Sequence, residues 1–184
     1  MKRILSLLAI IALLSGTFAL PAAAAPDTTG YAAEVLRLVN AERKKAGLAE
    51  LRGMAPLSSA AQKRAEEIAV TFDHKRPNGS GCFTVLGEYG VSSQARGENI
   101  AAGQTTPAQV MSGWMNSPGH RANILGDYDR LGVGVHVKNN TVYWSQMFIR
   151  EGAGPSGSAP KWKTWPAWAQ WLMRIFAFGW LWMR

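Results

Sequence analysis

Two alternating stretches near residue 140 constrain the fold more than any other feature of the sequence. Leu131 to Val137 and Val142 to Ile149 both alternate in polarity, and Lys138 to Thr141 between them is rich in turn-forming residues. This pattern predicts an antiparallel β-hairpin. The first strand places Leu131, Val133, Val135 and Val137 on one face and Gly132, Gly134 and His136 on the other. Because glycine lacks a side chain, a helix or a ligand can approach that second face closely.

The segments before the hairpin favour helices. Apolar spacing and capping residues predict helices over Tyr31 to Ala46, about Pro56 to Phe72, Thr106-Pro107 to Asn116, and a short one capped by Ser117 with Pro118 at its first position. Trp114 is expected in the core. Helices followed by an antiparallel hairpin, without βαβ alternation, indicate an α+β fold in layers.

The two ends of the chain differ from its body. Residues 1–25 combine Lys2 and Arg3 with an apolar run and an Ala-Ala-Ala cleavage site, which is typical of a signal peptide. A membrane span is disfavoured because the apolar run is short. We therefore expect export to the extracellular space or cell surface. Residues 26–150 form the predicted domain, 151–160 a flexible linker by composition, and 161–184 a separate tail.

The positive charge is concentrated outside the predicted domain. Six of the eight net positive charges come from residues 1–25 and 161–184. The body is therefore nearly balanced, and a basic stripe of the kind that binds nucleic acid is not expected on it.

The tail is aromatic and basic. It contains six of the eight tryptophans, Trp162, Trp165, Trp168, Trp171, Trp180 and Trp182, with four basic residues and no acid. Tryptophan favours the boundary between lipid and water, and cations favour an anionic surface. We expect this amphipathic C-terminal helix to lie on a membrane or anionic wall polymer. Spanning is disfavoured by Arg174, and a partner-binding helix is the alternative.

The unusual polar chemistry lies between residues 73 and 125. His74 is in a turn-rich loop, Glu98 follows Gly97, and His120 follows a second helix start. Loops and the ends of helices often present functional groups. The spacing matches no compact metal motif, so hydrogen bonds that merely hold loops together are the alternative for Glu98 and His120. Such a structural role is favoured for Asn99 and Asn123.

Five motifs in this body resemble one family. The runs FDHKRPNG, GENIAAG, WMNSPGHRANIL, LGVGV and YWSQMF follow one another between Tyr31 and Arg150. They resemble the CAP superfamily of cysteine-rich secretory, antigen 5 and pathogenesis-related proteins, and most of all its bacterial SCP-like extracellular branch. The resemblance implies a three-layer α-β-α sandwich with an antiparallel sheet and a large open cleft.

The resemblance also implies residues for that cleft. Eukaryotic members hold a divalent cation there with two histidines and two acids, and here His74 matches the first histidine and Glu98 the first acid. The second acid is replaced by Ser117, and Tyr143 stands where the second histidine opens the strand motif that continues to Gln146. His120, which is the bacterial branch's own histidine, could supply a second imidazole to the cleft from a neighbouring helix. The expected ligand cleft comprises His74, Glu98, His120, Ser117, Tyr143 and Gln146.

A metal in this cleft is one of two alternatives. His74, Glu98 and His120 would satisfy a zinc-like site with an open position. With a single acid, zinc is favoured over Ca²⁺, which prefers six to eight oxygen ligands. A cleft without a metal is the other alternative. Cys82 is the only cysteine, so no intramolecular disulfide forms, and we expect it to be buried for packing.

Two functions are consistent with this cleft. Members of the family resembled are more often treated as binding modules than as enzymes. We therefore expect a non-catalytic module that binds a lipid, envelope or protein ligand at the cell surface. The alternative is a metal-dependent hydrolase acting on peptides or wall material, with Glu98 as its base. Ser117 is a poor nucleophile candidate because an N-cap hydroxyl is engaged by backbone N–H groups.

Overall fold

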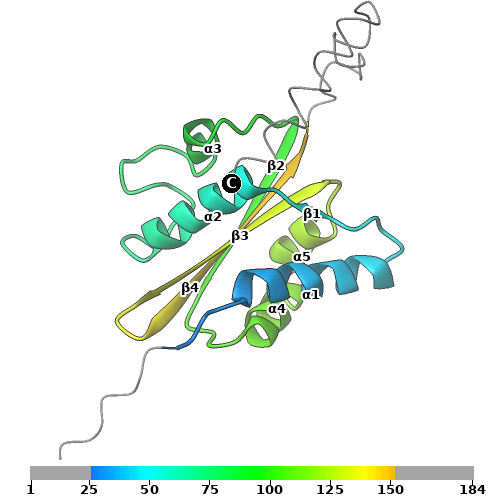
Figure 1. The fold of residues 1–184 in the computed structure, drawn as a ribbon, viewed down its shortest axis with the longest axis horizontal. Coiled ribbons are helices and arrows are strands. Elements are labelled where there is room, and N and C mark those ends of the chain that lie inside the picture. The colour runs from blue at the N-terminus through cyan, green and yellow to red at the C-terminus, as the bar shows by residue number, and fades with distance from the viewer. Residues whose placement is uncertain (1–25, 152–184) are drawn as a thin grey trace, which may run out of the picture.

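The computed structural model describes residues 26–151 and consists of one mixed sheet between two layers of helices (Figure 1). The strands are β1 (Arg52–Gly53), β2 (Ala95–Ala102), β3 (Arg130–Lys138) and β4 (Thr141–Arg150), in the order β1-β3-β4-β2. β2, β4 and β3 pair antiparallel, whereas the two-residue β1 pairs parallel to β3. β2 is therefore at one edge of the sheet. The predicted α-β-α sandwich is confirmed.

One face of the sheet is covered by α2 (Ala55–Ile68), with α3 (Thr84–Glu88) beside it. The two glycines of the first hairpin strand allow this close packing. A Cβ at Gly132 would lie 2.3 Å from the carbonyl oxygen of Leu57, and one at Gly134 would lie 2.1 Å from that of Ala61. The predicted close approach of a helix to this face is thus confirmed, and α2 is that helix.

The opposite face is covered by α1 (Tyr31–Lys45), α4 (Pro107–Met115) and α5 (Pro118–Ile124). Their core with the sheet is dominated by aromatic and branched side chains, including Trp114, Trp144 and Phe148. The indole of Trp144 also stacks on Tyr31 with ring centroids 5.5 Å apart. This face is a conventional apolar core.

Most elements begin and end near their predicted positions. The hairpin turn uses Asn139 and Asn140, both with positive φ, as a tight two-residue β-turn requires. The hydroxyl of Thr106 accepts a hydrogen bond from the Gln109 N–H and caps α4 as expected. The helix predicted to reach Phe72 instead ends at Ile68, and Phe72 is 56% exposed. Strand β2 was not predicted.

Parts of the sequence prediction concern residues outside the described range. The signal peptide, most of the linker and the tryptophan-rich tail lie in 1–25 and 152–184, so the structure describes none of them. Among the helices within residues 26–151, none has the length and apolar character that crossing a bilayer demands.

Candidate functional site

The candidate site is built around the carboxylate of Glu98 on β2. Its Oε1 accepts a hydrogen bond from Nε of Arg64 at 2.8 Å, and its Oε2 lies 2.7 Å from Nδ1 of His74. The side chains of Arg64 and Glu98 are 0% and 1% exposed, whereas that of His74 is 58% exposed. An ionised carboxylate can only accept, so Nδ1 of His74 carries the proton. A buried ion pair therefore orients an imidazole that faces solvent.

The loop that carries His74 also carries Cys82. Lys75 and Gly81 form an isolated antiparallel bridge, and the Cys82 N–H donates to the His74 carbonyl at 3.0 Å. The Asn78 side chain accepts from the Ser80 N–H and closes the loop. This geometry places residues 74 and 82 opposite each other and brings Cys82 against Glu98. Burial, followed by the charge of Glu98, raises the pKa of the Cys82 thiol to about 12.

A second layer of ion pairs supports the first. Arg64 also donates to Glu67 at 2.9 Å and to the Asp73 carbonyl. Glu67 in turn accepts from Arg76, whose guanidinium also pairs with Glu88. Burial alone would raise the pKa of Glu67, but the hydrogen bonds from Arg76 and Arg64 outweigh it and hold that pKa below its ordinary value of 4.5. Glu67 is thus held ionised at neutral pH, between two cations.

The next residue of β2, Asn99, points to the other face of the sheet. Its Nδ2 donates to the His120 carbonyl at 3.1 Å and to Oε1 of Gln146 at 3.0 Å, while its Oδ1 accepts from Asn123. Asn123 also donates to the Glu98 carbonyl. The structural role expected for the two asparagines is therefore what the structure shows. It fixes α5, and with it His120, against the edge of the sheet.

The charges of the two histidines influence each other around this edge. Burial, and then the nearby charge of His74, lowers the pKa of the half-buried His120. Consecutive residues of one strand thus anchor the two histidines, since Glu98 holds the ring of His74 and Asn99 holds the backbone of His120.

The other residues expected in the cleft have different surroundings. Gln146 is fully buried and contacts Asn99 and the Met111 sulfur on the α4 side of the sheet. Tyr143 is half-buried and pairs with Ala102, whereas Met147 pairs with Glu98. Four residues of strand separate these pairs by roughly 13 Å. Ser117 is half-buried at the start of α5, where its side chain makes no capping hydrogen bond, so the prediction that its hydroxyl is engaged by backbone N–H groups is wrong.

Two residues of the site were missed by the sequence analysis. Arg64 lies on the same stripe as Leu57, Ala61 and Ile68, so a charge at a predicted core position was the signal for a buried ion pair. Cys82 is buried as expected, but beside a carboxylate and an imidazole rather than in a purely apolar environment. Its proximity to His74 depends on the loop bridge, which no local sequence pattern reveals.

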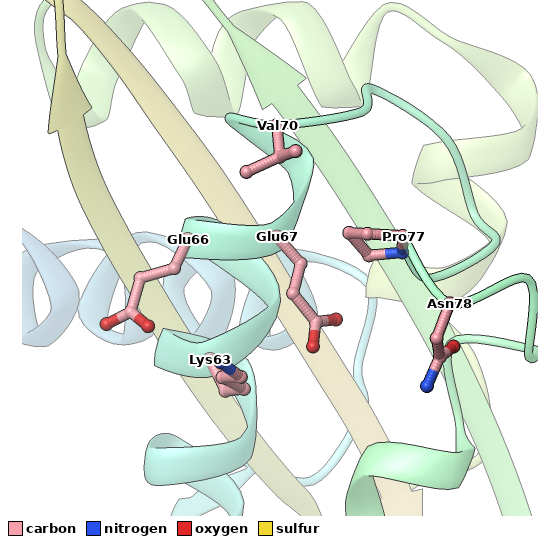
Figure 2. A pocket seen from close by; sticks show the side chains of 6 residues that line it. All are labelled: Lys63, Glu66, Glu67, Val70, Pro77 and Asn78. Atoms are coloured by element: carbon pink, nitrogen blue, oxygen red, sulfur yellow. The ribbon is translucent and has the colours of Figure 1, made fainter.

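Behind this ion-pair network is a pocket of 340 Å³ on the outer side of α2 (Figure 2). It is lined by Lys63, Glu66, Glu67, Val70, Pro77 and Asn78. Figure 2 shows that its walls come from α2 and from the loop after it, with the Glu67 carboxylate directed between them. His74, Glu98 and His120 do not line it, so Glu67 separates this pocket from the candidate site.

The geometry can be compared with known proteins. A family model for the cysteine-rich secretory protein family, CAP, matches residues 36–148. The chain belongs to the CAP family. The chain is 39% identical over 126 residues to the uncharacterized protein YkwD of Bacillus subtilis. This alignment covers 67% of the chain and 48% of YkwD. The chain is 36% identical over 120 residues to the uncharacterized membrane protein YlbC of the same organism, and this alignment covers 64% of the chain and 34% of YlbC.

Solved CAP structures share the fold. An extracellular SCP-domain protein from Bacillus anthracis superposes with a TM-score of 0.62 at 30% identity, covering 67% of this chain and 41% of that one. An outer surface protein of Borrelia burgdorferi superposes with a TM-score of 0.63 at 22% identity, covering 68% of this chain and 96% of that one. At this identity, the likeness supports the fold alone. The chain spans less than half the length of YkwD, YlbC and the B. anthracis protein. It is a CAP-domain protein of the bacterial extracellular type.

The arrangement limits the chemistry of this CAP domain. Both oxygens of Glu98 have protein partners, and the carboxylate is buried beneath His74. A general base must reach the proton it removes, and here His74 lies between Glu98 and solvent. The exposed group that can meet a ligand is the imidazole, which can donate or accept a hydrogen bond according to its protonation.

Proposed function

We propose that this CAP domain is a non-catalytic binding module for a component of the cell envelope, recognised through His74 and His120. One observation carries the proposal: an exposed imidazole is held in place by a buried carboxylate that is itself fixed by Arg64. Rigid presentation of a polar group favours binding because less conformational entropy is lost on association. The extracellular B. anthracis relative supports the location.

The ligand chemistry follows from the two imidazoles. Because Nδ1–H of His74 is engaged by Glu98, its Nε2 accepts a hydrogen bond from a ligand when the ring is neutral and donates one when the ring is protonated. A protonated imidazole also attracts a negative charge. Phosphate and carboxylate groups of lipids and wall polymers provide both features. We therefore propose an anionic envelope ligand.

The hydrolase alternative receives less support from the same geometry. Glu98 would have to exchange a hydrogen bond with Arg64 or His74 for one with a water molecule before it could act as a base. Because its side chain is 1% exposed, that exchange also requires the surrounding loop to move. A binding role requires neither change.

The proposal is tested with two probes, purified peptidoglycan sacculi carrying wall polymer and vesicles of phosphatidylglycerol. Binding of the full-length chain is measured by co-sedimentation in the presence of EDTA. We expect His74→Ala and His120→Ala to reduce binding to one of the probes at least about tenfold, the loss of a charge-assisted hydrogen bond. His136→Ala, on the half-buried surface of β3, is the matched control.

Two outcomes would contradict this function. Unchanged binding by both cleft variants would remove the imidazoles from recognition. Release of soluble fragments from the sacculi, lost in Glu98→Gln, would instead establish a hydrolase.

A second proposal concerns the tail of residues 161–184, which lies outside the described residues. Its six tryptophans and four basic residues support attachment to an anionic membrane or wall surface. Deleting 161–184 should weaken pelleting with at least one of the two probes, while the fold-loss of binding caused by His74→Ala stays the same. Equal pelleting of the truncated chain would refute the tether.

A further inference from the structure

The outer side of α2 carries a groove that is longer than the pocket in Figure 2. A second pocket, of 480 Å³, lies beside that one, and Lys63 and Glu66 line both. Together the two pockets extend along the chain from Ser58, near the start of α2, to Val70, just beyond its end. Twelve helical residues rise about 18 Å. We call this surface, along residues 58–70, the α2 groove.

Exposed apolar side chains gather along the α2 groove. Within residues 26–151, the large apolar side chains that are exposed are Leu48, Val70, Phe72 and Tyr89. Val70, which is 67% exposed, lines one of the two pockets, and Tyr89 lines the other. Phe72 follows Val70 by two residues. Apolar groups exposed side by side are typical of a surface that binds a partner.

The charged side chains of the groove define the partner further. Glu66 is exposed and forms no ion pair with any of the described residues. A cationic partner would complement it, and the ammonium group of Lys63 can lie over the face of an aromatic ring. A partner that is both aromatic and basic therefore fits this groove.

The chain leaves the described structure close to one end of the groove. Ile149, near the end of β4, packs in one apolar cluster with Leu57 of α2 and Leu86 of α3. Ser58 follows the first of these leucines and Tyr89 comes three residues after the second, and both line the groove. The end of the described chain at residue 151 is thus on the side of the groove where α2 begins.

Residues 152–160 are enough to bring the tail to any part of the groove. Nine residues span at most about 30 Å, and a Gly/Ser-rich chain of that length spans about 15–18 Å on average. The groove is about 18 Å long. A short linker also gives an effective concentration of order millimolar. Even a weak intrinsic affinity would therefore keep the groove occupied.

From these observations we propose that residues 161–184 dock in the α2 groove of the same chain when no membrane is present. The tail has the required chemistry, because it combines six tryptophans with four basic residues and no acid. Its tryptophans cover Val70 and Tyr89, and Lys161 and Lys163 pair with Glu66. Docking of an amphipathic segment in a groove is a common mode of recognition, and it shields aromatic surface that would otherwise aggregate.

Docking and attachment to a membrane use the same tryptophans, so one excludes the other. A membrane competes with the groove, and the apparent affinity of the tail for the membrane is reduced by the fraction of chains in which the tail is docked. The inference concerns a surface separate from His74 and His120, so it does not depend on the envelope ligand proposed for them.

The first test measures acrylamide quenching of tryptophan fluorescence in the full-length chain at micromolar concentration. Trp114 and Trp144 are 2% and 0% exposed, so quenching by acrylamide reports mainly on the tail. The variant Glu66→Lys/Val70→Lys, the groove variant, removes the carboxylate and an apolar contact. We expect the quenching constant of the wild-type chain to be at least about threefold smaller than that of the groove variant.

Leu48→Lys/Glu50→Lys is the matched control, because it makes the same two changes at exposed residues that do not line the groove. Its quenching should equal that of the wild-type chain. The groove variant should also bind phosphatidylglycerol vesicles at least about threefold more tightly than this equally charged control, because its tail is always available. Circular dichroism melting establishes that both variants are folded.

The second test locates the docked tail. A carbodiimide joins carboxylates to amines that are in contact, and we expect it to link Glu66 to Lys161 or Lys163 within one chain. Mass spectrometry of the monomeric product identifies the link. Added phosphatidylglycerol vesicles should reduce its yield.

Three results would overturn the proposal. They are equal quenching of the wild-type chain and the groove variant, absence of the link to Glu66, and a link found only between two chains, which would assign the groove to a second copy. Vesicle binding without docking would leave the membrane tether intact. Docking without vesicle binding would refute the tether alone.

Discussion

The two faces of the sheet are stabilised by different interactions. The face toward α1, α4 and α5 buries large side chains such as Trp114, Trp144 and Phe148. The face toward α2 instead combines alanines and bare glycine backbone with the buried ions Arg64, Glu67 and Glu98. Buried ion pairs add little net stability compared with apolar packing, but removing one partner is costly. Single substitutions of these ions should therefore be poorly tolerated on the face toward α2.

The largest effect is expected where α2 lies directly on the sheet. In Gly134→Val, Cβ would be 2.1 Å from the Ala61 carbonyl oxygen, and the obstacle is helix backbone, which cannot rotate away. We expect no folded protein, or destabilisation beyond the usual 1–3 kcal/mol of overpacking, about 4 kcal/mol or more. The free energy of unfolding is measured by urea unfolding followed by circular dichroism.

Gly87→Ala is the matched glycine control. Gly87 lies within α3, has ordinary backbone angles and has no atom within 4 Å of a Cβ. It should be stabilising by about 0.5–1 kcal/mol. Equal destabilisation by both glycine variants would contradict the close contact.

A slightly smaller effect is expected from removing the central cation. Arg64→Met leaves Glu98 and Glu67 buried without this partner and should lower the free energy of unfolding by about 3–5 kcal/mol. The double variant Arg64→Met/Glu98→Gln should recover part of that loss, since one uncompensated charge is gone. Additive losses in the double-variant cycle would show that Arg64 and Glu98 are not coupled.

Acid should weaken the charged face first. The pKa of Glu67 is lowered in the folded state, so its contribution is present above the unfolded value of 4.5 and lost as the pH falls through the lower folded value. The free energy of unfolding should thus decline as the pH falls below about 4.5. In Glu67→Gln the decline should be shallower; an unchanged slope would exclude this residue as its source.

The smallest effect on stability is expected at the exposed histidine. Because the His74 side chain is 58% exposed, His74→Ala should change the free energy of unfolding by less than about 1 kcal/mol. Envelope binding should nevertheless fall as proposed. A loss of stability as large as that of Arg64→Met would make His74 a structural residue.

The sequence predicts the hairpin, the helix caps and the glycine contact because these depend on local patterns. Gly132 and Gly134 alternate with branched residues, and Pro107 follows a capping threonine. Strand β2 escapes such reasoning because Arg96 and Glu98 interrupt its apolar character. It exists through eight residue pairs with β4. Its strand identity is a tertiary property.

The candidate site was predictable only in part for the same reason. His74, Glu98 and His120 could be singled out from motifs, but their order from buried to exposed could not. The cation beneath Glu98 could have been found from Arg64 on the apolar stripe of α2. The approach of Cys82 to His74 depends on pairing within one loop.

The anchoring of both histidines by neighbouring residues of β2 has a consequence for how such domains can diversify. The distance between the anchors is one peptide unit, which is among the most rigid components of a protein. The loop after Asp73 and the segment before α4 can therefore be lengthened by insertions without altering the spacing between Glu98 and Asn99. A single-residue insertion between residues 98 and 99 would instead turn one of the two anchoring side chains to the other face of the sheet, away from its histidine.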